Sequence, residues 1–296
     1  MLDLRRLRLL RELKIRGTLA SVAAALAYSP SAVSQQLAIL EKEAGVRLLV
    51  PTGRRVQLTP QAEILVEHTT RLLEQLELME AEMNSSLESV SGTVRMAVFQ
   101  SAALGIVPQA LTSLSEQYPA LRVEVTQREP DSALASVWAR EFDLVIAEQY
   151  PGHSARHLPK LDREVLCFDR LRLGTAPGSG IRSLEETAAT PWVMEPRGTA
   201  SRHWSEQMCR AAGFEPDVRF ETADLQAHIR LLESGNAVAI LPDLVWAGRA
   251  PSVDLVELAG APERTVFTSV RAANASQPTI IACRKVLKES VGFLAT

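Results

Sequence analysis

Residues 29–45 read SPSAVSQQLAILEKEAG, and this stretch decides the architecture of the N-terminal part of the chain. Ser29 is a favourable N-cap residue, and Pro30 fits the first turn of a helix, where no backbone N–H is needed. The apolar side chains that follow recur at intervals of three and four residues, at Val33, Leu37, Leu40 and Ala44. This periodicity predicts an amphipathic helix with one face in a core.

A shorter, alanine-rich segment at residues 18–28 has a similar helical spacing, and a tight joint at residues 28–30 separates the two segments. Two short helices joined in this way predict a helix-turn-helix, whose second helix enters the major groove of DNA with its first side chains at the base edges. On the polar face near the start of that helix lie Ser31, Ser34 and Gln35, the predicted base contacts. The alternative is an ordinary helical hairpin of an enzyme.

The N-terminal part of the chain is basic. Residues 1–58 carry ten Lys and Arg and four Asp and Glu, a net charge of +6, so the total of −3 leaves −9 on the other residues. A basic segment joined to an acidic body is typical of a polyanion-binding module attached to a domain of another function. Its first part, residues 2–16, predicts a helix with its arginines outside and with four leucines inside, at Leu4, Leu7, Leu10 and Leu13.

Two short β-prone runs follow, at residues 46–49 and 56–58, around a turn at residues 51–55. The turn carries Arg54 and Arg55, and the arrangement predicts a wing. Arginines in a wing contact the DNA backbone. Such contacts make the affinity depend on salt, but they contribute little to the recognition of base sequence.

Thr59 and Pro60 predict the start of a long helix that extends to about residue 89. Its apolar side chains form a narrow seam, at Leu65, Leu72, Leu76, Met79, Met83, Leu87 and Val90. Because one helix cannot bury such a seam alone, we expect it to pair with the same helix of a second copy. The alternative is packing along its own domain.

Beyond residue 92 the pattern changes to short apolar strands that alternate with helices, in two series. We expect two doubly wound α/β lobes with parallel sheets, joined by crossovers near residues 163–175 and 264–272, and a ligand cleft between the lobes. The predicted domains of this multi-domain α+β chain are a winged helix-turn-helix at residues 1–58, a linker and dimerisation helix at 59–91, and an effector-binding domain at 92–296, with lobe I at about 92–162 and 270–296 and lobe II at about 163–269.

The order of these parts resembles that of the LysR-type transcriptional regulators over nearly the whole chain. The most specific matches are Ala24-Ala25-Leu26, the segment from Ser29 to Leu37, Leu40-Glu41, Leu48, Gly53-Arg54-Arg55 and Leu58-Thr59-Pro60. Weaker matches follow in the expected order, at Asp143-Leu144-Val145, Pro196-Arg197-Gly198, and Gly235 with residues 238–242.

The resemblance implies a winged helix-turn-helix, a dimerising linker helix and a two-lobe effector domain like that of periplasmic binding proteins. It also implies a homodimer or homotetramer on an inverted repeat of double-stranded promoter DNA, a small-molecule effector in the cleft, and contact with RNA polymerase. Carried onto this chain, it assigns base contacts to Ser31, Ser34 and Gln35, and backbone contacts of the wing to Arg54 and Arg55. Pro51 departs from the family, because many relatives carry a basic residue there.

Candidate effector-binding residues lie at helix starts and strand ends. Ser101 and Ala102 precede a helix expected to begin near Ala103, and a second helix follows Gly198, Thr199 and Ser201. Two helix N-termini that face each other favour a small carboxylate. Candidates at strand ends are Arg128, Glu129, Glu148, Gln149, Glu195, Arg197 and Glu221.

The acids among these residues suggest a second feature of the effector. If Glu148 and Glu195 line the cleft, the sequence favours an effector with an amine, such as an amino acid. The alternative is that these acids pair with arginine or face solvent.

The sequence predicts no catalysis, metal or cofactor. Ser201 and His203 are two residues apart on one helix and face different sides, His153 and His157 lack further ligands, and no glycine-rich phosphate loop is present. Three dispersed cysteines indicate free thiols, with Cys167 a core residue rather than a redox sensor. Because there is no signal segment and no apolar run of membrane-spanning length, we expect a cytoplasmic protein without membrane contact.

Two other functions stay open. One is a cytoplasmic small-solute-binding protein or enzyme whose N-terminal helices serve association only. The other is a constitutive DNA-binding protein with a vestigial cleft. Salt-dependent binding of duplex DNA discriminates against the first, and stabilisation by an effector discriminates against the second.

Overall fold

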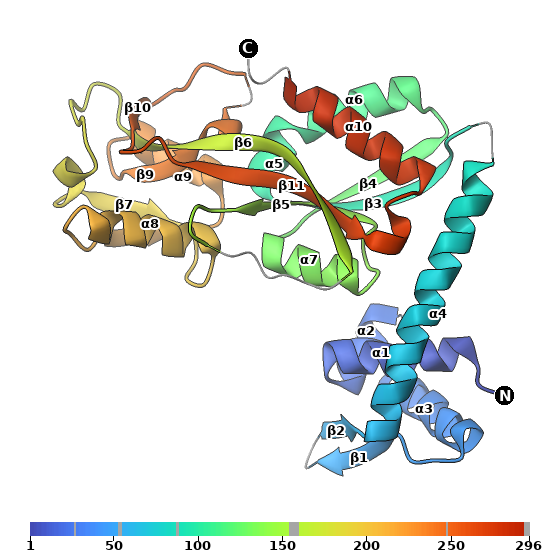
Figure 1. The fold of residues 1–296 in the computed structure, drawn as a ribbon. Coiled ribbons are helices and arrows are strands. Elements are labelled where there is room, and N and C mark those ends of the chain that lie inside the picture. The colour runs from blue at the N-terminus through green and yellow to red at the C-terminus, as the bar shows by residue number, and fades with distance from the viewer. Residues whose placement is uncertain (27, 53–54, 87–88, 154–159, 247, 293–296) are drawn as a thin grey trace. The chain divides into compact units, whose positions relative to one another are not determined.

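A computed structural model describes the chain apart from residues 27, 53–54, 87–88, 154–159, 247 and 293–296 (Figure 1). The chain divides into two compact units, Met1–Met83 and Asn84–Thr296. The first unit contains α1 (Leu4–Arg16), α2 (Leu19–Leu26), α3 (Pro30–Ala44), β1 (Leu49–Thr52), β2 (Arg55–Leu58) and most of α4 (Pro60–Ser85).

The core of the first unit confirms the predicted inner face of α3. Val33, Leu37 and Leu40 are at most 1% exposed and pack against leucines of α1 and against α2. The Ser29 hydroxyl accepts the N–H of Ala32 at 3.1 Å, and Gly45 ends the helix in the left-handed conformation with φ 68°. A favourable N-cap, a proline and a C-terminal glycine therefore bound the helix as the sequence predicts.

The inner face of α1 differs from the prediction. Leu7, Leu10 and Leu13 lie in the core, but Leu4 is 39% exposed. Arg11, expected outside with the other arginines, is 1% exposed and pairs with Glu12 at 3.2 Å. Ion pairing lets a guanidinium occupy a buried position that its charge alone would exclude.

The hairpin after α3 begins later than predicted, because β1 and β2 pair antiparallel from Leu49 opposite Leu58 to Thr52 opposite Arg55. Glu41 of α3 accepts the backbone N–H groups of Leu48 and Leu49 at 2.8 and 3.0 Å, which fixes the hairpin to the helix.

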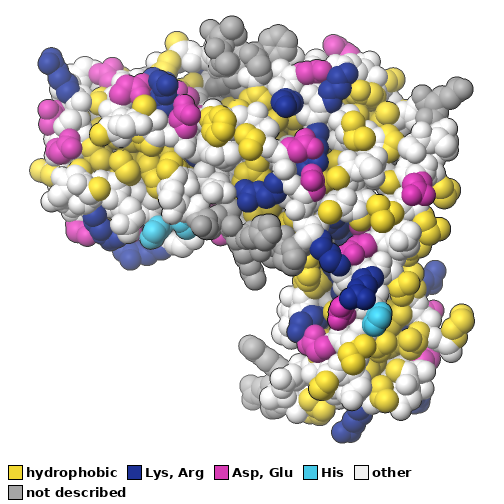
Figure 2. All heavy atoms as spheres, in the orientation of Figure 1, with side chains coloured by type: hydrophobic (Ala, Val, Ile, Leu, Met, Phe, Trp, Pro, Cys, Tyr) yellow, Lys and Arg dark blue, Asp and Glu magenta, His cyan; other side chains and the backbone are white. Residues whose placement is uncertain are grey.

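Helix α4 ends at Ser85, short of the predicted residue 89. The Thr59 hydroxyl accepts the N–H of Ala62 at its start. Four members of the predicted seam are between 37 and 68% exposed, at Leu72, Leu76, Met79 and Met83. Figure 2 shows hydrophobic and charged side chains interspersed along this helix. Leu87 lies outside the described residues, and Val90 packs in the second unit.

The second unit is an α/β domain with three short 3₁₀ turns, η1 (Glu185–Thr187), η2 (Asp243–Val245) and η3 (Ala272–Asn274). Its helices are α5 (Gln100–Gly105), α6 (Val107–Gln117), α7 (Pro130–Trp138), α8 (Ala200–Ala211), α9 (Leu225–Glu233) and α10 (Pro278–Gly292). Its strands are β3 (Gly92–Val98), β4 (Leu121–Gln127), β5 (Leu144–Gln149), β6 (Leu161–Thr175), β7 (Pro191–Met194), β8 (Asp217–Glu221), β9 (Ala239–Pro242), β10 (Asp254–Glu257) and β11 (Glu263–Arg271).

The sheets are mixed, so the prediction of purely parallel sheets is wrong. β3 pairs in parallel with β4 and β5, and β7 with β8. β11 runs antiparallel to β5 and β6, and β6 runs antiparallel to β9 and β10. The two crossover strands cause this difference, because β6 leaves the first lobe while β11 returns to it.

The long strands β6 and β11 join the two lobes as predicted (Figure 1). Up to Arg170, β6 pairs with β11, and from Leu171 onward it pairs with β9 and β10. The expected lobe bound at residue 162 therefore falls within the part of β6 that belongs to the first lobe. The other expected domain bounds stay predictions.

Helices cover the sheet of the first lobe on both faces. α6 and α10 pack on one face around Val94, Met96 and Leu287, and α7 packs on the other around Ala97 and Val145. The second lobe is built in the same way, with α8 and α9 on separate apolar clusters. Within the described residues, no helix is both long and apolar enough to cross a bilayer.

Candidate functional site

The start of α3 presents the three predicted base-contact residues to solvent. Ser31, Ser34 and Gln35 are all exposed, and the Ser31 hydroxyl lies 2.9 Å from that of Ser29. The next residue, Gln36, turns inward, and its side-chain oxygen accepts the Nε–H of Arg6 at 3.0 Å. The helical turn therefore separates two adjacent glutamines into an outward and an inward side chain.

Only some of the basic residues around this helix are exposed. Arg6 pairs with Glu43 at 2.5 Å, and Lys14 pairs with Glu63 at 2.5 Å. Arg54 lies outside the described residues, and Arg55 belongs to β2 but its side chain is not described. Lys14 stays exposed despite its ion pair, and the other exposed basic side chains described in the first unit are Arg5, Arg8, Lys42, Arg47 and Arg71.

A cavity of about 320 Å³ opens in the second unit between the lobes, a size that suits a small ligand. It is lined by Glu129, Pro130, Asp131, Ser132, Glu148, His153, Glu195, Arg197, Gly198, Thr199, Ala200 and Ser201. Seven of the predicted effector candidates thus line it, at Glu129, Glu148, Glu195, Arg197, Gly198, Thr199 and Ser201.

Five predicted effector candidates are not among the residues that line this cavity, Ser101, Ala102, Arg128, Gln149 and Glu221. α5 begins at Gln100, so Ser101 and Ala102 lie inside the helix and are fully buried rather than exposed at its start. Ala102 packs in the core of the first lobe. Arg128 is exposed and donates its backbone N–H to the carbonyl oxygen of Val98 at 2.8 Å.

The sequence did not indicate that Arg264 of β11 is part of this site. Its side chain is 3% exposed. Its guanidinium forms ion pairs with Glu148 of β5 and with Asp169 of β6, the latter at 2.6 Å. It also donates to the hydroxyls of Ser101 at 2.6 Å and Tyr150 at 3.4 Å. β11 lies between β5 and β6, and this order brings the three charged groups together.

The pKa values at this cluster follow first from burial and then from the sharing of one cation between two acids. Burial raises the pKa of Glu148 to about 7, and repulsion from Glu195 and Asp169 adds to the effect. The positive charge of Arg264 lowers the pKa of Glu148, but Arg264 also forms an ion pair with Asp169. Burial also opposes the charge of Arg264, yet attraction to the two acids outweighs it and raises the pKa of Arg264, which stays a cation.

Two side chains, Thr199 and Ser201, form hydrogen bonds at the start of α8. Thr199 caps the helix by accepting the N–H of Arg202, and the Ser201 hydroxyl donates to the Glu195 carboxylate. The buried Arg202 guanidinium donates to the backbone carbonyl oxygen of Glu195 at 3.2 Å, which fixes this residue in place. Burial raises the pKa of Glu195, although the bond from Ser201 acts in the opposite direction.

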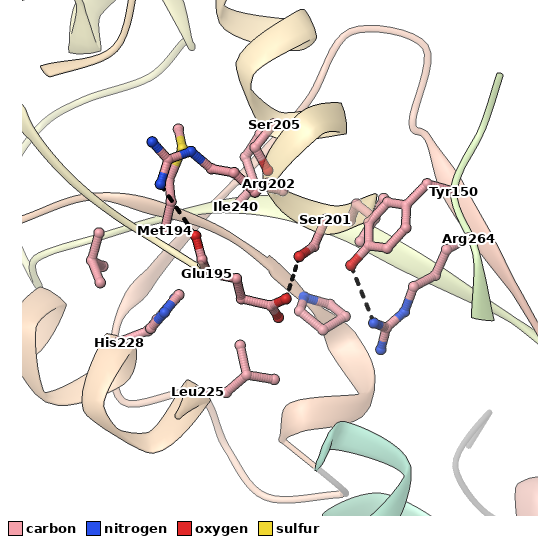
Figure 3. A pocket seen from close by; sticks show the side chains of 13 residues that line it. Tyr150, Met194, Glu195, Ser201, Arg202, Ser205, Leu225, His228, Ile240 and Arg264 are labelled. Carbon is pink, nitrogen blue, oxygen red and sulfur yellow. Dashed lines mark hydrogen bonds between the residues drawn. The ribbon is translucent and has the colours of Figure 1, made fainter. Parts of the chain in front are cut away.

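A smaller chamber of about 20 Å³ adjoins this site and shares Glu195 and Ser201 with the larger cavity (Figure 3). Tyr150, His228 and Arg264 are also in its wall. His228 is 3% exposed, and its Nε2 lies 2.8 Å from the carbonyl oxygen of Thr222. The chamber is large enough for one water molecule.

The described part of the chain contains no group of three or more His, Cys, Asp or Glu placed to hold a metal ion. Arg264 could be found from sequence only as a charged residue in an apolar strand, because its partners lie more than ninety positions away.

Two family models match the chain. The model described as "Bacterial regulatory helix-turn-helix protein, lysR family" matches residues 4–63, and the model described as "LysR substrate binding domain" matches residues 87–292. Among curated proteins, the transcriptional dual regulator GltC of Bacillus subtilis (strain 168) is 26% identical over 252 residues, which cover 84% of each chain.

Solved structures share the fold. A full-length OxyR variant from Pseudomonas aeruginosa superposes with a TM-score of 0.68 at 18% identity, covering 98% of this chain and 95% of that chain. Full-length CbnR in complex with its target DNA superposes with a TM-score of 0.55 at 21% identity, covering 98% of this chain and 100% of that chain.

Proposed function

Because the chain belongs to the LysR family of bacterial helix-turn-helix regulators, we propose that α3 reads an inverted repeat of promoter DNA through its first turns. The family assignment makes the protein a DNA-binding transcription regulator with a substrate-binding domain. We further propose that a small molecule in the 320 Å³ cavity modulates its binding to the promoter or its activation of transcription.

One observation carries the DNA-reading proposal. α3 buries its apolar face against α1 and α2, and it leaves Ser34 and Gln35 exposed at the end that would enter the major groove. Gln and Ser side chains bond to base edges, with Gln suited to adenine. Arg54 and Arg55 of the hairpin stay proposed contacts to the DNA backbone.

The adjacent glutamines give a matched test. We would measure fluorescence anisotropy of the wild type, Gln35→Ala and Gln36→Ala on the intergenic DNA upstream of its own gene and on scrambled DNA, over a salt series. Gln35→Ala should remove about 1–3 kcal/mol of discrimination between the two DNAs. Gln36→Ala should keep that discrimination, because Gln36 faces Arg6.

Binding of the two DNAs with equal affinity by the wild type would contradict sequence reading at this promoter. Equal loss of discrimination in both variants would assign Gln35 a structural role instead of a base contact.

For the effector we propose a small carboxylate. Arg197 and Gly198 precede the capped start of α8, where backbone N–H groups and the helix dipole favour an anion. Ser201 completes this end of the cavity.

We also propose that the protein is a homodimer through α4, assembles further into a tetramer, contacts RNA polymerase and acts in the cytoplasm without an enzymatic reaction. The exposed seam of α4 supports the dimer. The family assignment supports the other statements.

A further inference from the structure

The wall of the larger cavity carries more negative than positive charge. Among the described residues of this wall, the acids are Glu129, Asp131, Glu148 and Glu195, and the arginine is Arg197. Arg264 lies behind Glu148 and is shared with Asp169. Within the described lining, acids therefore outnumber the guanidinium groups that could neutralise them.

The four acids line one cavity, so a single ligand can meet several of them, and their charges also act on one another. Partial burial and the charge of Asp131 raise the pKa of Glu129. Glu129 in turn contributes to the raised pKa values of both Glu148 and Glu195. A ligand that carried only negative charge would add to this repulsion, whereas a cation would relieve it.

In the adjoining chamber, the ring of His228 also lacks a hydrogen-bond donor among the described residues. The Nε2 of His228 faces a carbonyl oxygen, which only accepts, so Nε2 carries the proton. Burial lowers the pKa of His228, which keeps the ring neutral and leaves Nδ1 as a bare acceptor. In the described part of the chain this buried Nδ1 has no hydrogen-bond partner.

The wall common to the cavity and the chamber is therefore rich in acceptors. Glu195 borders both spaces, with Glu148 on the cavity side and His228 on the chamber side. Figure 3 shows the Glu195 carboxyl group and the His228 ring in the wall of the same chamber. A primary ammonium group matches this surface, because it has three N–H donors and no acceptor.

We propose that the effector is an amino acid, whose ammonium group binds among Glu129, Glu148 and Glu195 while its carboxylate lies at Arg197 and the start of α8. One water molecule in the chamber donates to Nδ1 of His228 and accepts from the ammonium group. This inference rests on the proposed effector function and specifies the chemical class of the ligand. A cavity of about 320 Å³ has room for such a molecule.

The ligand class is tested with matched pairs of compounds on the full-length protein. Each standard amino acid other than proline is compared with the 2-hydroxy acid of the same side chain, for example L-alanine with L-lactate, by thermal unfolding and then by calorimetric titration. We expect at least one amino acid to raise the unfolding temperature, and its hydroxy acid to bind about tenfold or more weakly.

Variants then locate the ammonium group. Glu195→Gln keeps the size of the side chain but removes its charge, and it should weaken binding of the amino acid by about tenfold or more without a matching loss for the hydroxy acid. Glu116→Gln, an exposed acid on α6, is the control and should leave both affinities unchanged.

Equal binding of an amino acid and its hydroxy acid, or stabilisation by hydroxy acids alone, would overturn the amine inference and leave the carboxylate effector standing. Stabilisation by none of these compounds would overturn it as well. Failure of the proposed DNA-reading function is detected by a separate measurement, in which the protein binds promoter DNA and scrambled DNA with equal affinity.

Discussion

At the scale of single residues, Arg264 holds together groups from several elements. Its guanidinium meets Glu148 and Asp169, while the other oxygen of Asp169 accepts the N–H of Leu244 in η2 at 2.9 Å. The hydroxyls of Ser101 in α5 and of Tyr150 accept further hydrogen bonds from Arg264. One side chain thus links strands β5, β6 and β11 to α5, and through Asp169 to η2.

Arg264→Met should be strongly destabilising. It leaves two buried carboxylates without their cation, and breaking a buried pair costs about 3–5 kcal/mol. Urea unfolding of the effector domain measures this loss. Arg249→Met, at an exposed arginine, should change stability by about 0.5 kcal/mol or less. Similar losses in both variants would mean that the cluster contributes no specific stability.

Glu148 should make stability depend on pH. Its pKa is raised by burial to about 7 from 4.5, so the folded chain binds more protons than the unfolded chain between these values. The free energy of unfolding should therefore fall as pH rises from about 4.5 to about 7. Glu148→Gln should remove this contribution, on the order of 3 kcal/mol.

Urea unfolding of both proteins across this pH range checks the expectation, with Glu116→Gln as the control. Parallel stability curves for the wild type and Glu148→Gln would contradict a raised pKa at Glu148.

The three cysteines should be unreactive in the folded protein. Burial raises the pKa of Cys167 to about 11, and those of Cys209 and Cys283 to about 12, so the nucleophilic thiolate is scarce at neutral pH. A thiol reagent should react slowly with the native chain and with all three thiols after unfolding in urea. Rapid modification of one native thiol would identify a reactive cysteine and contradict this assignment.

At the scale of elements, α3 shows how local sequence positions a functional surface. The Ser29 cap, the inner Val33, Leu37 and Leu40, and the bonds from Glu41 to the hairpin fix the rotation of the helix. That rotation decides that Gln35 faces outward and Gln36 inward.

Ser29→Ala should destabilise the first unit by about 1 kcal/mol, because the N–H of Ala32 loses its acceptor. The matched change Ser34→Ala removes an exposed hydroxyl from inside the same helix and should be neutral or slightly stabilising. Thermal unfolding of the two variants measures the difference. If they unfolded at the same temperature, the cap at Ser29 would contribute nothing to stability.

At the scale of the whole molecule, the exposed seam of α4 indicates self-association. Leu72, Leu76, Met79 and Met83 lie at intervals of four, three and four residues and remain exposed in the single chain. A seam with this spacing is typical of a helix that packs along a second helix.

Met79→Glu should shift the protein from dimer to monomer. It should also weaken DNA binding, because a monomer contacts only one half-site of the inverted repeat. Leu78→Glu places the same charge on a different face of the helix and should keep the dimer. Sedimentation equilibrium over a concentration series distinguishes the two variants. A dimer that withstands Met79→Glu but not Leu78→Glu would place the interface on the other face.

The sequence by itself determined the features that depend on neighbouring residues. The period of Val33, Leu37 and Leu40, the cap at Ser29 and the proline at Pro60 act within one or two turns, so local sequence alone locates α3 and the start of α4. The alternation of strands and helices likewise indicated two lobes, since each element leaves its own pattern.

Only the tertiary structure decided what surrounds the cavity. Ser101 was expected to meet a ligand but bonds Arg264 inside the fold, and Glu148 both lines the cavity and pairs with that arginine. These contacts depend on β11 lying between β5 and β6, an order set by long-range pairing. The energy of a charged side chain depends on which charges the fold brings beside it, and sequence neighbours carry no record of that.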